Sequence, residues 1–414
     1  MRYSEFARWA SPIALSLAIG SPVMAQQLYD VKVSLTETYD SNVSRTSQAL
    51  AKLRGVRQSD EIFSPQIALD LHKALGRESL FLNGTTGYDI YSYNHRLDRE
   101  RVDLNGGVEA PIGPCHSRLV GSIGRHQSDL EELSSTTLTN TTNTQNLTSE
   151  GLQTSCGRLV GVTPTFAVSA SQAVNSASTL RSSDHNQFSA NVGLGYQRPT
   201  LGNISLFYAY NQTTYQNRLF IVGTLTFVNG LPVIQNAHIV KDQYSVNEIG
   251  VRYARELGAK LQGTVSVSHS TVHNAIPGAG DFQGLTYQAG LSFKASSRLS
   301  TNFDFSRTVK PSSNPGAAYS LAELYSLGAT YQLGSRINVG LGASRTTQTF
   351  QGAGLVHAVD ITHETIDRFY GRVGFRVGRR ISLNLDARHD ERGANIPGFS
   401  YGDTRVGLSL AASY

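Results

Sequence analysis

The segment Arg405–Tyr414 has the sequence RVGLSLAASY, in which apolar residues occupy nearly every second position. Val406, Leu408 and Leu410 alternate here with glycine and serine. Successive side chains of a β-strand point to opposite faces, so a period of two predicts a strand with one apolar and one polar face. The same alternation recurs over 101–110, 285–294 and 381–388.

Composition excludes several classes of protein for this chain of 414 residues. Charged residues make up 16 %, below the roughly 25 % of an ordinary soluble domain. The mean hydropathy of −0.23 shows that apolar residues do not replace the missing charge, which argues against a helical membrane protein with spans of about 20 apolar residues. Two cysteines exclude a disulfide-rich scaffold and a cysteine-based zinc module.

Residues 1–25 are predicted to be a secretory signal peptide. Arg2 and Arg8 give a basic start, 12–20 form a short apolar core, and Val23-Met24-Ala25 fits a cleavage site. A membrane anchor is the alternative, although the apolar core is too short to span a bilayer. Residues 26–414 then form the mature protein in an exported, disulfide-permissive compartment.

Strand length and connection pattern discriminate between a soluble β-sandwich and a membrane barrel, which both show alternation. The alternating segments run for about 10 to 15 residues, longer than the roughly 5–6 of globular strands and near the 9–11 of a tilted membrane strand. Short turns, for example near 75–77, 257–259 and 334–335, alternate with long polar segments such as 41–58, 128–148 and 216–241.

We therefore predict an all-β fold: a transmembrane antiparallel β-barrel with short periplasmic turns and long extracellular loops in the bacterial outer membrane. The pattern gives about 18 strands, with 16 as the alternative, and the sixth strand is placed at 149–156. Barrels of this size leave an aqueous channel. Residues 216–241 carry an Asn-Gly hairpin signal and either project from the barrel or fold inward.

The last segment also resembles the signal that hands outer-membrane barrels to the assembly machinery. Leu408 and Leu410 lie on its apolar face, and Tyr414 is the aromatic at its end. A sandwich strand that happens to end the chain is the alternative.

Residues Tyr39-Asp40-Ser41-Asn42-Val43 lie where the first strand meets the first long segment. An entrance of this kind on an exported many-stranded barrel resembles the β-barrel porin family that includes EpsL-type outer-membrane proteins of exopolysaccharide operons. The resemblance implies an outer-membrane channel for polysaccharide or oligosaccharide. It also implies outer-membrane lipid, the barrel assembly machinery, a saccharide polymer or oligomer and periplasmic export proteins as partners.

Charged side chains on membrane strands are expected to face the lumen, since an ion facing hydrocarbon costs several kcal/mol. Guanidinium groups bind carboxylate, sulfate or phosphate, and aromatic rings stack on sugars. The alternative is that the arginines pair with Asp386, Asp367 or Glu364 and only brace the wall. The candidate lumen contacts are Arg101, Arg118, Arg368, Arg372, Arg376, Arg388, Arg405, Tyr91 and Tyr370.

Strand placement brings the two cysteines together. Cys115 begins one predicted strand after a periplasmic turn, and Cys156 ends the next before the following turn. Consecutive antiparallel strands place these ends side by side, so we expect a disulfide that closes a loop of about 40 residues. Two free thiols are the alternative.

No catalytic residues, metal ligands or cofactor site are predicted, and the small basic excess does not support nucleic-acid binding. The leading hypothesis is a non-enzymatic channel for export or passage of polysaccharide or oligosaccharide, within an exopolysaccharide biosynthesis and secretion system. The alternatives are a general diffusion porin for small solutes and a non-conducting barrel that anchors a polysaccharide machine.

Overall fold

The computed structural model describes residues 28–127, 142–157, 160–228, 231–276, 280–312, 317–352 and 361–413. The predicted signal peptide and Tyr414 lie outside the described residues. No helix within these ranges is long and apolar enough to cross a membrane.

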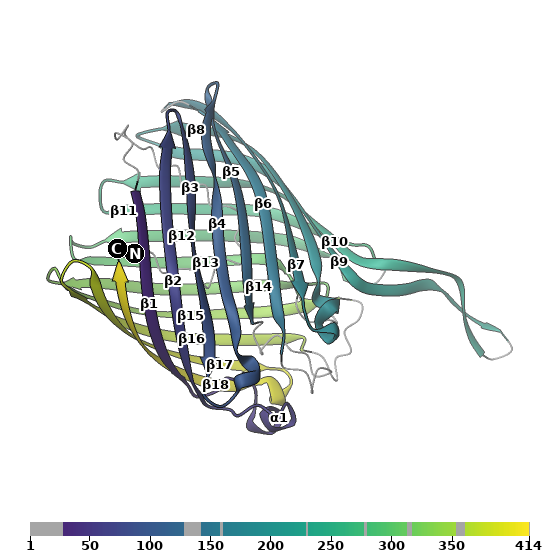
Figure 1. Cartoon of the computed structure of the whole chain (residues 1–414). Coiled ribbons are helices and arrows are strands. Elements are labelled where there is room, and N and C mark those ends of the chain that lie inside the picture. Colours follow the sequence, from purple (N-terminus) through teal and green to yellow (C-terminus); the bar gives the residue numbers. More distant parts are fainter. Residues whose placement is uncertain are drawn as a thin grey trace.

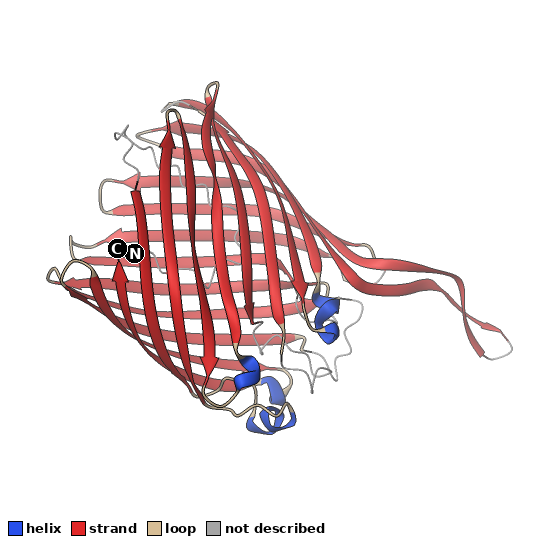
Figure 2. Cartoon of the chain, in the orientation of Figure 1, coloured by secondary structure: helices blue, strands red, loops and turns tan. Residues whose placement is uncertain are grey.

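Eighteen antiparallel strands form one closed sheet, which confirms the predicted fold (Figures 1 and 2). Each strand pairs with the next along the chain, and β1 pairs with β18 to close the barrel. The strands are β1 Leu28–Asp40, β2 Asp60–Leu75, β3 Glu78–Tyr91, β4 Arg99–Ile112, β5 Cys115–Gln127, β6 Thr144–Cys156, β7 Gly161–Asn175, β8 His185–Arg198, β9 Gly202–Val228, β10 Leu231–Leu257, β11 Leu261–Asn274, β12 Phe282–Lys294, β13 Leu299–Pro311, β14 Tyr319–Leu333, β15 Ile337–Gln351, β16 His363–Val377, β17 Ile381–Ala394 and β18 Tyr401–Ser413.

Helical segments occur only in the long connections of the described chain. They are α1 Gln48–Leu53 and the 3-10 turns η2 His95–Leu97, η4 Ser178–Ser183 and η5 Pro397–Phe399. The Ser47 hydroxyl caps α1 by accepting from the Leu50 amide. Both chain ends lie at the end of the barrel away from α1 (Figure 1). The short turns are on the same side as the chain ends, as an even strand number requires.

The two faces of each strand differ as the alternation predicts. On β16, Phe369 is 57 % exposed and Val373 is exposed on the outer face, while Arg368 and Arg372 occupy the alternate, inner positions. Leu408 and Leu410 are likewise exposed on the outer face of β18. The apolar belt therefore surrounds the barrel and polar side chains line its interior.

The start of β6 and the segment 216–241 differ from the predicted strand pattern. β6 begins at Thr144 rather than at 149, because its first few residues, which are mostly polar, pair with β5 and β7. Residues 216–241 lie mostly in strands: β9 and β10 each contain 27 residues. β8 pairs with β9 only as far as Tyr215, and β11 pairs with β10 only from Tyr244. The hairpin beyond them projects past the barrel rim (Figure 1), as one of the two sequence alternatives predicts.

Some charges on strands face outward, contrary to the expectation that all face the lumen. Arg345 on β15 forms a two-point ion pair with Asp367 on β16, with distances of 2.6 and 2.7 Å. Arg125 on β5 pairs with Glu100 on β4 at 2.7 Å. The residues of both pairs lie on the same, outer face of their strands as the exposed aliphatic side chains nearby. Each pair lies toward the end of the barrel that carries the long loops. Pairing lowers the charge that the outer surface presents.

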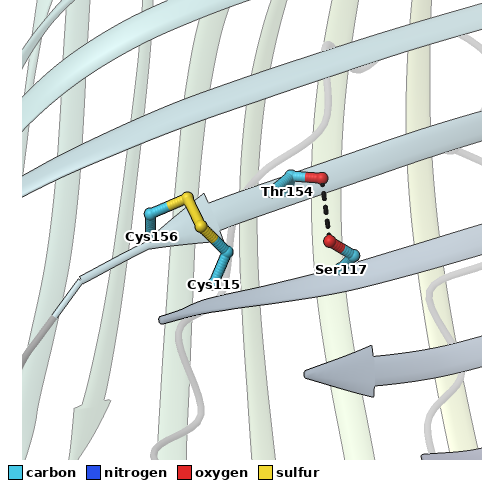
Figure 3. The surroundings of a disulfide bond; sticks show 4 residues. All are labelled: Cys115, Ser117, Thr154 and Cys156. Carbon is cyan, nitrogen blue, oxygen red and sulfur yellow. Dashed lines mark hydrogen bonds between the residues drawn. A yellow bond between two sulfur atoms is a disulfide. The ribbon is translucent and has the colours of Figure 1, made fainter. Parts of the chain in front are cut away.

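A disulfide joins Cys115 and Cys156 at the short-turn end of the barrel (Figure 3). The two residues are direct partners in the β5–β6 ladder. Two residues along, the Ser117 and Thr154 hydroxyls are hydrogen-bonded at 3.0 Å across the same strands. The bridge therefore fixes the pairing register at the end where β5 begins and β6 ends.

Replacing both cysteines by serine should lower the free energy of unfolding. The bridge closes a separation of 41 residues, and the chain-entropy model assigns such a loop roughly 3–4 kcal/mol. Denaturant unfolding of the refolded barrel, with and without reductant, measures the effect. Equal stability of C115S/C156S and the unreduced wild type would contradict it.

Candidate functional site

The Asp40–Val43 segment joins the first and last strands where the barrel closes. Asn42 donates its backbone N–H to Asp40 at 2.9 Å and to Asp403 at 3.2 Å. The Asn42 side-chain amide donates to the carbonyls of Thr46 and Gly402 at 3.1 and 3.2 Å. Short polar side chains bond nearby backbone groups in this way at turns. The segment therefore turns the chain at the rim and ties β1 to β18.

Four arginines gather around three carboxylates on the wall formed by β16, β17, β18 and β1. Arg368 and Arg388 both donate from Nε to Asp390 Oδ1, at 2.9 and 2.8 Å. Arg388 makes a second contact with the same carboxylate through Nη2. The two guanidiniums share one carboxylate.

The other half of this wall contains two carboxylates and two arginines. Arg405 lies 2.8 Å from Asp403 and 3.5 Å from Asp40, measured from Nε to the carboxylate oxygens. Arg45 reaches the same two carboxylates at 2.9 and 2.6 Å. We call Arg45, Arg368, Arg388 and Arg405 with Asp40, Asp390 and Asp403 the arginine wall.

Burial within the arginine wall is unequal. The Asp390 and Asp403 side chains are 2 % and 1 % exposed, whereas Arg368, Arg388 and Arg405 are 30 %, 22 % and 24 % exposed. Solute in the lumen therefore meets guanidinium edges, with the carboxylates behind them. The sequence alternative of structural pairing holds for these arginines, but with Asp390, Asp403 and Asp40 as partners.

Tyr370 provides an aromatic surface beside the arginine wall. It is the ladder partner of Arg388 and occupies an inner position of β16. A Cβ on Gly342 would lie 2.2 Å from the Tyr370 ring, and the hydroxyl reaches toward Gly328. Glycines on β14 and β15 thus allow the ring to lie against the inner surface, with its side chain exposed.

The remaining arginines of β16 lie nearer the short-turn end. Arg372 is opposite Asp386 in the β16–β17 ladder, and Arg376 is opposite Ser382. Arg376 is exposed one residue before the strand ends. Arg368, Arg372 and Arg376 thus follow the inner surface of β16 from its middle to the short-turn end, and Arg368 belongs to the arginine wall.

The earlier candidates lie on a different sector of the wall. Arg101 lies 3.8 Å from Asp89, and Arg118 lies 3.2 Å from Glu109 and covers the Phe81 ring at 4.6 Å. Tyr91, at the end of β3, packs against a hydrophobic cluster of the loops. The structure does not bring these residues to the arginine wall, so the candidates form two groups rather than one path.

Long connections pack together at the extracellular mouth. Val43 and Val56, on either side of α1, pack with Leu97 before β4 and Leu180 of η4. A second buried cluster joins α1 to β15 and to the connections on the β14–β18 side of the barrel. Its members are Leu50, Ala317, Phe350, Ile361 and Phe399. These residues belong to β15 and to connections that follow one another around the rim from β13–β14 to β1–β2, so neighbouring connections pack together along the mouth.

A buried cation lies within this loop layer. Arg54, just after α1, is 1 % exposed and lies over the Phe399 ring at 5.8 Å. Burial, with a smaller contribution from the nearby charge of Arg392, lowers the pKa of Arg54 to about 10. The guanidinium therefore remains charged at neutral pH inside the loop layer.

The residues on either side of the β13–β14 connection reach inward to β9, which lies four strands from β13 around the wall. Tyr215 of β9 donates to the Ala318 carbonyl at 2.7 Å, and the Ser312 amide donates to the Tyr215 hydroxyl at 2.8 Å. Arg218 donates to the carbonyls of Ser312 and Ala317. The β12–β13 ladder stops at Tyr287–Arg307, which frees the upper part of β13 to bend.

Arg218 holds three segments at this point. It pairs with Asp242 of β10 at 3.4 Å, lies 3.7 Å above the Tyr215 ring and bonds the Ser182 carbonyl of η4 at 2.5 Å. Both partners of the ion pair are buried. Sequence reasoning missed this residue, and its only signal was an arginine at the start of a long uncharged stretch, 219–240.

Among the described residues, no group of three or more histidine, cysteine, aspartate or glutamate side chains is placed to hold a metal ion. The chemistry that this interior offers is recognition by charge, hydrogen bonding and aromatic contact.

A closed wall with an apolar exterior and a charged, polar interior defines a porin-like β-barrel channel. Residues 243–414 match the family model described as "Putative beta-barrel porin 2". This match confirms the predicted resemblance to a β-barrel porin family, and it covers the strands that carry most of the arginine wall.

Three solved structures are similar in fold. OccK2 (OpdF) of Pseudomonas aeruginosa in complex with glucuronate has 12 % identity and a TM-score of 0.48, covering 94 % of this chain and 98 % of that one. A BenF-like porin from Pseudomonas fluorescens Pf-5 has 12 % identity, coverages of 93 % and 99 %, and a TM-score of 0.46. The FrpB iron transporter from Neisseria meningitidis has 8 % identity, coverages of 88 % and 62 %, and a TM-score of 0.49. No curated protein matches the sequence.

Releasing the inward β13–β14 connection should enlarge the open channel. The variant Y215F/R218Q/D242N removes four hydrogen bonds to this connection without leaving Asp242 as an unpaired buried charge. At about 1 kcal/mol each, their loss shifts docking by two to three orders of magnitude. We expect a higher single-channel conductance.

Lys241→Gln is the control, because Lys241 is an exposed neighbour of this cluster on β10. Its conductance should equal that of the wild type. Wild-type conductance in a correctly folded Y215F/R218Q/D242N barrel would show that the connection does not narrow the lumen.

Proposed function

We propose that this protein is an outer-membrane diffusion porin that passes small solutes and prefers anionic ones. The observation that carries the proposal is the burial pattern of the arginine wall: Arg368, Arg388 and Arg405 are partly exposed, while Arg45 and the carboxylates are almost completely buried. A guanidinium binds a carboxylate, sulfate or phosphate through two parallel hydrogen bonds.

Exposed carboxylates elsewhere on the inner wall support an orienting role. Asp70 on β2, Asp103 on β4 and Asp304 on β13 occupy inner positions and are exposed. Asp304 lies on a strand outside the arginine wall, whereas Asp70 lies on β2 beside β1. Asp103 shares its strand with Arg101, so charges of both signs line the interior beyond the arginine wall. A polar solute would turn its anionic end toward β16–β18, while its hydroxyl groups exchange hydrogen bonds with the uncharged polar lining.

The packed loops favour small solutes over a polymer. Clusters around Leu50 and Val43 pack the long connections together along the rim, and the residues flanking the β13–β14 connection reach inward to β9. A wide continuous path for polysaccharide would require this inward segment to move. The general porin alternative therefore suits the structure better than export of exopolysaccharide. The export hypothesis rests on the family resemblance of the sequence alone.

Removing exposed guanidiniums should weaken the anion preference. In R388Q/R405Q, Asp390 keeps Arg368, and Asp40 and Asp403 keep Arg45, so no buried carboxylate loses its last partner. A charge about 4 Å from a permeating ion contributes about 1 kcal/mol in water. The anion-to-cation permeability ratio should fall about fivefold, measured from reversal potentials in planar bilayers.

The matched control is R125Q/R345Q, which removes the same charge from outer-face pairs. Its permeability ratio should stay at the wild-type value. An equal shift in both variants would assign the effect to net charge, and no shift in R388Q/R405Q would return the wall to a bracing role.

Solute size separates the transport hypotheses. We expect liposomes containing the protein to swell in monosaccharides and small organic anions, and to stop swelling as oligosaccharides lengthen. Passage of long anionic oligosaccharides would favour the polymer channel. Absence of both swelling and conductance would favour the non-conducting structural barrel.

A further inference from the structure

A one-signed arc of charge follows the short-turn rim from β8 to β17. In this arc, Glu256 is the one acidic residue within the last three strand positions or the turns. Besides Arg376, which lies on the inner face of β16, the basic residues at the same positions are Arg198, Arg255, Lys260, Lys294, Arg298, Arg336, Arg379 and Arg380. We call them the basic rim.

Several residues of the basic rim are exposed and are not balanced by ion pairs. In the described chain, no carboxylate lies within ion-pair distance of Lys260, Lys294 or Arg336, and their side chains are exposed. Arg255 and Arg298 have no such partner either. Such an arc attracts anions from its surroundings.

The rest of the same edge carries less positive charge. At the same positions, the β2–β3 turn has Lys73 and Arg77 with Glu78, a net charge of +1. The β4–β5 turn has no charged residue at these positions, and the next charges along its strands, Arg118 and Glu109, form an ion pair of 3.2 Å. The positive charge is therefore largest at the β12–β13 and β16–β17 turns.

Each part of the basic rim lies next to an aliphatic side chain on the outer surface. Leu257 is 47 % exposed between Arg255 and Lys260, and Leu333 is 54 % exposed just before Arg336. Long basic side chains beginning beside membrane-facing residues extend to the level of lipid headgroups.

We propose that the basic rim binds the phosphate groups of anionic phospholipids in the periplasmic leaflet. The orientation rests on the proposed outer-membrane function and on the prediction from the sequence that the short turns face the periplasm. Each guanidinium or ammonium would meet a phosphate while its neighbouring leucine or valine meets the acyl chains. The surface attracts a layer of headgroups, with each basic residue near the surface contributing independently.

The spread of the arc distinguishes lipid from a soluble acidic partner. The basic residues occur at five successive turns, separated along the edge by exposed aliphatics such as Leu201, Val377 and Ile381. A soluble protein would need a compact polar patch, whereas lipids surround the barrel and can fill each interval separately. An acidic protein or polymer is therefore an outcome of the test rather than the proposal.

Competition between two lipids tests the proposal directly. The full-length barrel is released from nanodiscs containing equal phosphatidylglycerol and phosphatidylcholine, and bound lipids are counted by native mass spectrometry. The wild type should retain phosphatidylglycerol preferentially. R255Q/K260Q/R298Q/R336Q should lose the preference, by about fivefold for each basic residue that contacts a phosphate, and added salt should weaken wild-type retention.

The control K52Q/K73Q/R77Q/K241Q removes the same charge from exposed positions outside the basic rim. It should retain phosphatidylglycerol as the wild type does. Equal retention of the two lipids by the wild type would overturn the proposal, as would equal phosphatidylglycerol preference in the rim variant. Binding of soluble polyglutamate by the rim without any lipid preference would also overturn it.

Conductance and labelling separate this proposal from the proposed function. The rim variant should still conduct, so a non-conducting wild type with intact lipid preference would remove the porin function alone. A cysteine at Ser335 should react with an impermeant reagent only after the outer membrane is opened. Labelling of S335C in intact cells would place the basic rim outside and overturn its assignment to the periplasmic leaflet.

Discussion

The structure depends on hydrogen-bond closure between β1 and β18. In lipid, every backbone N–H and C=O must find a partner within the protein, so an open sheet edge is not tolerated. The ladder joins the strands from Lys32–Ser413 to Asp40–Arg405. At its upper end, the carboxylates of Asp40 and Asp403 continue the closure through Arg45 and Arg405. The ion network that completes the seam is thus also the charged surface of the lumen.

Much of the fold could be predicted because the strands of a barrel alternate apolar and polar residues with a period of two. Segments such as 285–294 and 381–388 alternate strictly, and the short turns recur on one side of the connection pattern. Strand parity then placed Arg368, Arg388 and Arg405 on the inner face and brought Cys115 opposite Cys156. These are consequences of local pattern and neighbouring strands.

Contacts between distant segments could not be predicted. Even a local partner was missed: Arg388 pairs with Asp390, which faces the lumen from the same strand and also binds Arg368. The period of two allows such a pair but does not select it over a partner on the next strand. Arg218 binds carbonyls from residues nearly 100 positions away, and periodicity contains no information about which loop bends inward. Outer-face pairs such as Arg345–Asp367 are exceptions to the rule that charges on strands face the lumen, because the two opposite charges compensate each other on the outer surface.

The central claim is that lumen solutes meet guanidinium groups with their carboxylates buried behind them. The most direct measurement is the reversal potential of the wild-type channel across a potassium chloride gradient in a planar bilayer. The account predicts a potential with the sign of chloride preference, diminishing as salt screens the fixed charges. A potential with the sign of potassium preference, or a protein that inserts but never conducts, would contradict it.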